Sequence, residues 1–130
     1  MTAHLNVARI TDTFAAFAKG DLAVLNDVLA SDVLWHQGGR NQLSGDYHGR
    51  DAVLGFLGKM MQVTQGSFHV DVHAVLADDE HGVALVTLTA SRDARKIAVS
   101  AADVMHLRDG KVTEVWAILA DQYAFDELIG

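Results

Sequence analysis

The chain has 130 residues, half of them hydrophobic and 21% charged, a composition that excludes a disordered protein. It has no cysteine, which excludes disulfides and thiolate metal sites, and its net charge of −7 without a basic cluster argues against nucleic-acid binding. No apolar run approaches the roughly 20 residues that cross a bilayer, and residues 1–14 lack a signal-peptide pattern. We therefore expect one cytoplasmic domain over residues 1–130, with no nucleic-acid or membrane partner.

The first half of the chain predicts helices. Apolar residues recur at a helical period over residues 2–19, and Gly20 is a natural C-cap. Asp21 is placed to cap a second helix over residues 22–29, and a broad apolar face predicts a third over residues 50–65. Residues 32–37 are β-prone and predict a strand, whereas residues 38–49 predict a loop that we interpret as a flap over a pocket mouth.

The second half predicts strands. Residues 67–77 alternate cleanly, with Phe68, Val70, Val72, Ala74 and Leu76 on one face and His69, Asp71, His73 and Val75 on the other. A strand over residues 83–91 follows, then a long hairpin over residues 97–120, then a short helix or extension over residues 121–128. Helices followed by a meander of long antiparallel strands predict an α+β fold in which a strongly curved sheet encloses an apolar pocket.

The hairpin over residues 97–120 carries the most informative polar residue. Asp109 and Gly110 between apolar runs predict a type I′ turn. A regular hairpin around that turn would pair Met105 with Glu114 and Asp103 with Trp116. Asp103 is the only charge on a strand face that it shares with Val99, Ala101, Met105 and Leu107. It is either a buried carboxyl with a raised pKa or an ordinary carboxylate on a solvated face, and we favour the first.

Three short motifs carry a resemblance to a known family: Ala18-Lys19-Gly20-Asp21-Leu22, Gly45-Asp46-Tyr47-His48-Gly49-Arg50 and Asp109-Gly110-Lys111-Val112. With the order of elements, they make the whole chain similar to the SnoaL-like branch of the nuclear transport factor 2-like superfamily, which is related to polyketide cyclases and ketosteroid isomerases. The resemblance implies a cone-shaped α+β barrel with an antiparallel sheet wrapped on three N-terminal helices. The same fold serves enzymes, binding proteins and assembly modules.

The resemblance also assigns positions. Asp103 matches the aspartate that donates to an oxyanion in the isomerases. Gln37 stands where those enzymes have a general base, and the position at about Thr13 is where they have a tyrosine. Ala117 lies near the position of the aspartate that the cyclases use. Steroid isomerisation and the known cyclase chemistry are therefore not expected.

The predicted catalytic residues are Asp103 and His36, and the predicted ligand wall is Trp35, Gln37, Phe56, Met60, Phe68, Met105, Trp116 and Tyr123. Strand alternation allows either His36 or the pair Trp35 and Gln37 to point inward, unless a bulge intervenes. The set His69, Asp71 and His73 has a spacing that metal ligands use. We interpret it, and His106, as outer surface, and expect no metal and no cofactor.

These patterns together predict a protein that binds a small hydrophobic molecule. Its chemistry would be cofactor-independent acid/base catalysis of isomerase, cyclase, dehydratase or hydrolase type. The alternative is a non-catalytic ligand-binding or dimeric assembly module. A homodimer is expected in either case, through a sheet face bearing Val104, Ala102, Val86, Leu88 and Ala90.

Overall fold

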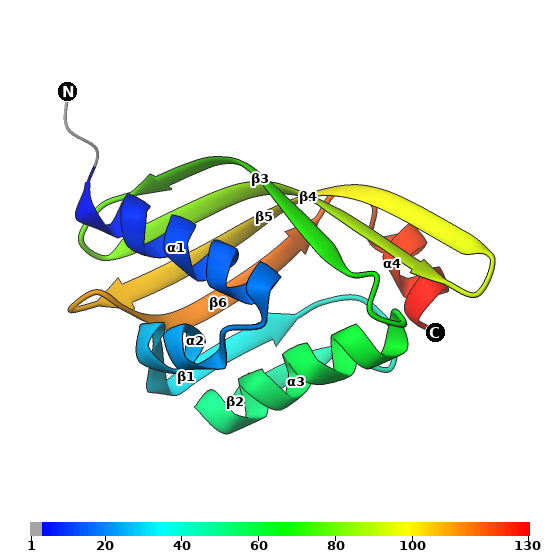
Figure 1. The fold of residues 1–130 in the computed structure, drawn as a ribbon, viewed down its shortest axis with the longest axis horizontal. Helices are drawn as coiled ribbons and strands as arrows, with labels where there is room; N and C mark the ends of the chain where they lie inside the picture. The colour runs from blue at the N-terminus through cyan, green and yellow to red at the C-terminus, as the bar shows by residue number, and fades with distance from the viewer. Residues whose placement is uncertain (1–3) are drawn as a thin grey trace.

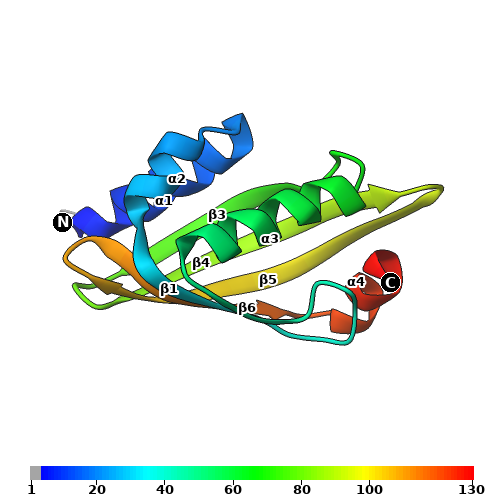
Figure 2. The same ribbon diagram turned by 90° about the horizontal axis from the view of Figure 1, so that it is seen from below.

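A computed structural model describes residues 4–130 of the chain. In that range six strands form one curved sheet in the order β2-β1-β6-β5-β4-β3. Helices α1, α2 and α3 cover one face of it, and α4 lies at the end of the sheet away from the N-terminus (Figures 1 and 2). The α+β class and the curved sheet under three N-terminal helices are as predicted. None of the helices within residues 4–130 is long and apolar enough to cross a membrane.

The helices begin and end where local signals place them. Helix α1 spans Leu5–Lys19, and Gly20 ends it in the left-handed conformation at φ 70°. Helix α2 spans Leu22–Val28, with the Asp21 carboxylate accepting a hydrogen bond from the Val24 N–H. The expected start of the first helix at Thr2 lies outside the described residues. Helix α3 spans Arg50–Val63, two residues shorter than predicted, and α4 spans Gln122–Ile129.

The first two strands differ most from the sequence prediction. Strand β1 spans Leu29–Gln37 and pairs in parallel with β6, so the sheet is mixed and not wholly antiparallel. Strand β2, Gly45–His48, pairs antiparallel with β1 inside the segment predicted as a loop. Its own sequence gives little signal because it is only four residues long.

The remaining four strands form the predicted meander. They are β3 (His69–Ala77), β4 (His81–Arg92), β5 (Arg95–Arg108) and β6 (Lys111–Leu119). The β5–β6 turn is type I′ as expected, because Asp109 and Gly110 have φ of 53° and 78°. Helix α1 crosses β4 at Gly82, where a Cβ atom would lie 2.5 Å from Ile10 Cδ1, so a glycine permits this close approach.

Two β-bulges change which side chains face the core. One lies between His106 and Leu107 in the β5–β6 pairing, and the other between Val72 and Ala74 in the β3–β4 pairing. A bulge adds one unpaired residue, so every side chain beyond it moves to the opposite face from that of a regular ladder. The predicted alternation of residues 67–77 is therefore wrong after Val72. Val75 pairs with the buried Ala84, and Leu76 is 58% exposed.

Candidate functional site

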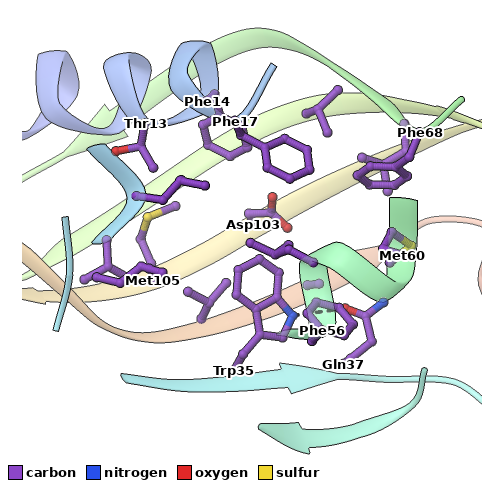
Figure 3. Close-up of a pocket in the computed structure, with 18 of the residues that line it drawn as sticks. Thr13, Phe14, Phe17, Trp35, Gln37, Phe56, Met60, Phe68, Asp103 and Met105 are labelled. Atoms are coloured by element: carbon purple, nitrogen blue, oxygen red, sulfur yellow. Dashed lines mark hydrogen bonds between the residues drawn. The ribbon is translucent and has the colours of Figure 1, made fainter. Parts of the chain in front are cut away.

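A cavity of about 100 Å³ lies between the inner face of the sheet and the helices that cover it (Figure 3). Three of its lining side chains are polar, namely Thr13, Gln37 and Asp103. All the others are apolar: Ile10, Phe14, Phe17, Leu25, Leu29, Trp35, Phe56, Leu57, Met60, Phe68, Val70, Leu88, Met105, Val112, Val115, Ala117, Leu119 and Phe125. Among residues 4–130, Asp103 is thus the single ionisable group of this lining.

Asp103 reaches the cavity because it alternates inward on β5 with Ala101 and Met105. Its neighbours across the sheet are Ala84 on β4 and Ala117 on β6. Both are small, which leaves space above the carboxyl group. Figure 3 shows Asp103 between Phe17 on the helix side and Trp35 on the opposite side.

The environment of Asp103 favours its neutral form. Burial raises the pKa of this carboxyl from its ordinary 3.8 to about 7. Desolvation is the sole cause, and within residues 4–130 no hydrogen bond to the carboxyl group offsets it. A carboxyl that exchanges a proton near pH 7 is suited to general acid/base catalysis, and one without a protein partner is available to a ligand. The favoured sequence interpretation, a desolvated carboxyl facing a pocket, agrees with this geometry. Its catalytic role stays a prediction.

Trp35 and Gln37 form the second polar feature of the cavity. Both alternate inward on β1, and the Trp35 indole N–H donates a 3.0 Å hydrogen bond to Gln37 Oε1. Gln37 is 6% exposed and pairs across the sheet with Ala117, which is also the partner of Asp103. The two polar side chains therefore flank one alanine on the cavity floor. The sequence left two orientations of this strand open, and the structure has Trp35 and Gln37 inward.

Two aromatic groups make the walls. Phe56 on α3 packs against Trp35 and Tyr47, with ring centroids 5.5 and 4.5 Å apart. Across the cavity, Phe17 on α1 meets Phe68 edge to face at 6.1 Å. Phe14 and Phe17 belong to the apolar residues whose helical period predicted the helix over residues 2–19, but neither was predicted to line the ligand pocket.

Trp116 lies outside the cavity, contrary to the prediction. The bulge beside His106 leaves Thr113 unpaired, so Asp103 pairs with Ala117 and Met105 with Val115. A one-residue shift moves Trp116 to the outer face of the sheet. The expected pair of Asp103 and Trp116 is therefore wrong.

His36 also faces outward, where it joins three strands. Its Nδ1 lies 2.9 Å from Asp46 Oδ1 on β2, and its Nε2 lies 2.7 Å from Glu114 Oε2 on β6. Its ring stacks on Trp116 at a centroid distance of 5.2 Å. The hydrogen bond with Glu114, followed by that with Asp46, raises the pKa of His36 above 6.5. Only an imidazolium donates from both nitrogens at once. His36 therefore cannot act on a ligand in the cavity from this position, and its contacts are structural.

Two other predicted elements of the site lie elsewhere. Tyr123 is 88% exposed on α4 and is not part of the cavity lining. The segment of residues 38–49, interpreted as a flap, contributes no residue to that lining. Its first part is bound to the C-terminal segment instead. Asn41 Nδ2 donates to Asp126 Oδ1 at 2.7 Å, and the Gln42 N–H donates to the Gly130 carbonyl at 2.7 Å.

The outer face of β3 carries the histidines considered as metal ligands. His69 and Asp71 lie 3.2 Å apart and are exposed, and His73 hydrogen-bonds with Thr87. Among residues 4–130, no three His, Cys, Asp or Glu side chains are arranged to hold a metal ion. His106 lies on this outer face as well, edge to face with Trp116.

Comparison with known proteins gives the same fold and a family. The model of the SnoaL-like domain family matches residues 10–115. The chain belongs to this SnoaL-like family. An uncharacterized protein of Mycobacterium tuberculosis is 32% identical over 125 residues, which cover 95% of each chain.

Two solved structures resemble this SnoaL-like protein over nearly its whole length. Bal32a, from a soil-derived mobile gene cassette, has a TM-score of 0.92 with 28% identity and 96% of each chain covered. A Xanthomonas campestris protein of unknown function with a cystatin-like fold has a TM-score of 0.90 with 28% identity, covering 96% of this chain and 98% of that one. The curved sheet and its helices thus form a cystatin-like, nuclear transport factor 2-like fold.

The positions that the family resemblance singled out all line the cavity of the SnoaL-like protein. They are Thr13, Gln37, Asp103 and Ala117. Of these four residues, Asp103 alone has an acidic side chain. The Thr13 hydroxyl donates to the Arg9 carbonyl at 2.7 Å, within its own helix, so its proton is already used.

Proposed function

We propose that this SnoaL-like protein binds a small, largely apolar organic molecule in the cavity, with Asp103 as its principal polar contact. The observation that carries the proposal is a carboxyl group with a pKa of about 7 and no hydrogen-bond partner among residues 4–130, set in an aromatic cavity. Aromatic walls with few convergent polar groups are typical of small-molecule sites. The cavity volume of about 100 Å³ is somewhat smaller than a cavity that binds benzene, so a single-ring ligand would fit after a small outward movement of the walls.

The chemistry that we propose is proton transfer without a cofactor. Near pH 7 about half of the Asp103 carboxyls hold a proton, so the group can donate to or accept from a bound molecule. Isomerisation, cyclisation, dehydration and hydrolysis all use such a step. Gln37 and the aromatic walls would then hold the substrate, because they do not titrate near neutral pH.

Titration of Asp103 is the first test. We expect carboxyl ¹³C NMR of the ligand-free protein to give a midpoint near 7 that disappears in Asp103→Asn. Toluene, as an apolar single-ring probe, should shift the methyl signals of Met60 and Met105 in a saturable way. A midpoint near the ordinary value of 3.8, or no saturable shift with toluene, would contradict the proposal.

A second candidate function is a dimeric assembly module, and the outer face of the sheet favours it. Two adjacent rows of paired residues there are apolar. One runs Leu76, Val83, Val104, Trp116 and the other Leu85, Ala102, Ile118. Leu76, Leu85 and Ile118 are between 42% and 58% exposed. The face expected from the sequence was partly wrong, since Val86, Leu88 and Ala90 are buried on the inner side.

Such an apolar patch, with polar rows beside it, fits a second copy of the chain. We expect sedimentation to give a dimer at micromolar concentration, and Leu85→Glu to give a monomer. Leu22→Glu is the matched control, because Leu22 is 63% exposed but lies on α2. A wild-type monomer, or a dimer that Leu85→Glu leaves intact, would remove this proposal.

A further inference from the structure

The Gln37 amide has a fixed direction. An indole N–H is a donor only, so the atom 3.0 Å from Trp35 Nε1 must be the carbonyl oxygen of the Gln37 side chain. The amide nitrogen is then the free end, and the orientation follows from chemistry and not from the assignment of the two atoms. Trp35 is itself held by the Phe56 ring, so the amide cannot turn over without losing this bond.

The free nitrogen opens onto the cavity. Gln37 is 6% exposed, and its side chain has one hydrogen bond among residues 4–130, the one from Trp35. In that range every side-chain nitrogen or oxygen atom that is fully shielded from solvent has a hydrogen-bond partner. The unbonded Nε2 of Gln37 must therefore border open space, and the space that its side chain lines is the cavity. An amide N–H₂ group in such a position is a donor waiting for an acceptor.

Gln37 and Asp103 are neighbours on the cavity floor. Both pair with Ala117, so their Cα atoms are two strand spacings apart, about 10 Å, on the concave side of the sheet. The alanine between them leaves that floor open. A ligand lying over Ala117 meets a permanent donor on one side and a group that donates or accepts on the other.

We propose that the ligand of this cavity carries a hydrogen-bond acceptor, an uncharged carbonyl or ether oxygen, which receives the Gln37 Nε2–H while its ring rests on the aromatic walls. This proposal rests on the proposed function and narrows its substrate class. Gln37 determines the specificity for an acceptor, and Trp35 is a positioning residue that acts through it. No cation lines the cavity within residues 4–130, so a carboxylate or phosphate ligand finds no counter-charge there.

Two single-ring probes of nearly the same shape test this. Acetophenone carries C=O where α-methylstyrene carries C=CH₂, and both fit walls of the same kind. We expect the wild-type protein to bind acetophenone at least about tenfold more tightly, because one neutral hydrogen bond changes affinity by about three- to tenfold and Asp103 adds a second contact. Binding is followed by the methyl signals of Met60 and Met105.

Gln37→Met keeps the size of the side chain and removes the amide. We expect this variant to bind acetophenone about five- to tenfold more weakly than the wild type does, and α-methylstyrene less than about twofold more weakly. Tyr123→Phe is the control, because Tyr123 lies outside the cavity, and it should change neither affinity. Equal loss of both probes in Gln37→Met, or equal binding of both by the wild type, would overturn the proposal and leave the proposed function standing. If neither probe binds, the proposed function itself is wrong and this inference falls with it.

The role of Trp35 has its own readout. In the wild type, the side-chain ¹⁵N–¹H₂ signals of Gln37 should move with acetophenone and stay in place with α-methylstyrene. Trp35→Phe keeps a ring against Phe56 but frees the amide to rotate, so the acetophenone-induced shift should shrink. A shift of unchanged size would mean that Trp35 only fills space, and would contradict its positioning role.

Discussion

Asp103→Asn is expected to be about as stable as the wild-type protein near pH 4 and more stable by about 4 kcal/mol at pH values above about 7. The pKa of this carboxyl rises from 3.8 to about 7 on folding. Between those values the unfolded chain releases a proton that the folded chain retains, so wild-type stability falls as pH rises. Each pH unit in this window contributes about 1.4 kcal/mol. Asparagine has nearly the same shape and no charge, so it escapes this loss.

Urea unfolding at a series of pH values measures the difference. The series can extend down to about pH 4, because the lowered pKa values of Asp78 and Asp126 affect both proteins alike and cancel in the difference between them. His36 adds a separate loss at higher pH. Its raised pKa stabilises the fold below 6.5, and that contribution disappears as pH rises through the folded-state value. It remains in Asp103→Asn, so the variant's curve should stay flat until about pH 6.5 and then fall slightly. Parallel curves for the two proteins would show that Asp103 is not desolvated.

A desolvated acid whose ionisation lowers stability across the neutral range does not serve the fold itself. Strained or desolvated groups of this kind concentrate at sites where they bind or react. The outer-face histidine shows the contrast. His36 on β1 has two carboxylates in contact, Asp46 on β2 and Glu114 on β6. The same strand thus has a histidine with two hydrogen-bond partners on its outer side and cavity-facing groups on its inner side.

The sequence predicted those features that depend on nearby residues. Gly20, Asp21 and the Asp109-Gly110 turn act on the backbone next to them, so the end of α1, the start of α2 and the type of the hairpin turn were correct. Asp103 was also placed correctly, because its inward direction follows from alternation within β5 alone. The parallel pairing of β1 with β6 joins residues far apart in the chain and has no local signal.

Trp116 shows where such reasoning fails. Its predicted position depended on counting residues across the turn, and the unpaired Thr113 adds one to that count. A bulge of this kind has no distinctive residue here, since threonine is an ordinary strand former. The bulge after Val72 likewise removes Leu76 from the face that it was predicted to share with Val70, and Leu76 is exposed. Alternation along a strand was therefore predicted correctly where no bulge intervenes, as at Asp103. Predictions that extended past a bulge, along one strand or between two, were wrong.

Phe56→Ala is expected to destabilise the protein by about 4 kcal/mol, within the range for loss of a buried phenylalanine. Phe56 is 3% exposed and is the one α3 ring that contacts both Trp35 on β1 and Tyr47 on β2. Removing it deletes buried apolar surface and leaves an enlarged cavity whose walls cannot close, because the strands on either side are fixed by their hydrogen bonds.

Urea unfolding at one pH gives the value, and Phe56→Leu is the matched variant that should lose much less, since it retains most of the volume. The enlarged cavity in Phe56→Ala should bind benzene, and saturating benzene should recover part of the lost stability by mass action. Trp35 loses its support in this variant, so acetophenone should lose affinity even where benzene gains it. A loss of unfolding free energy below about 1 kcal/mol would show that Phe56 does not support Trp35. The indole that receives no such support would then not fix the Gln37 amide either.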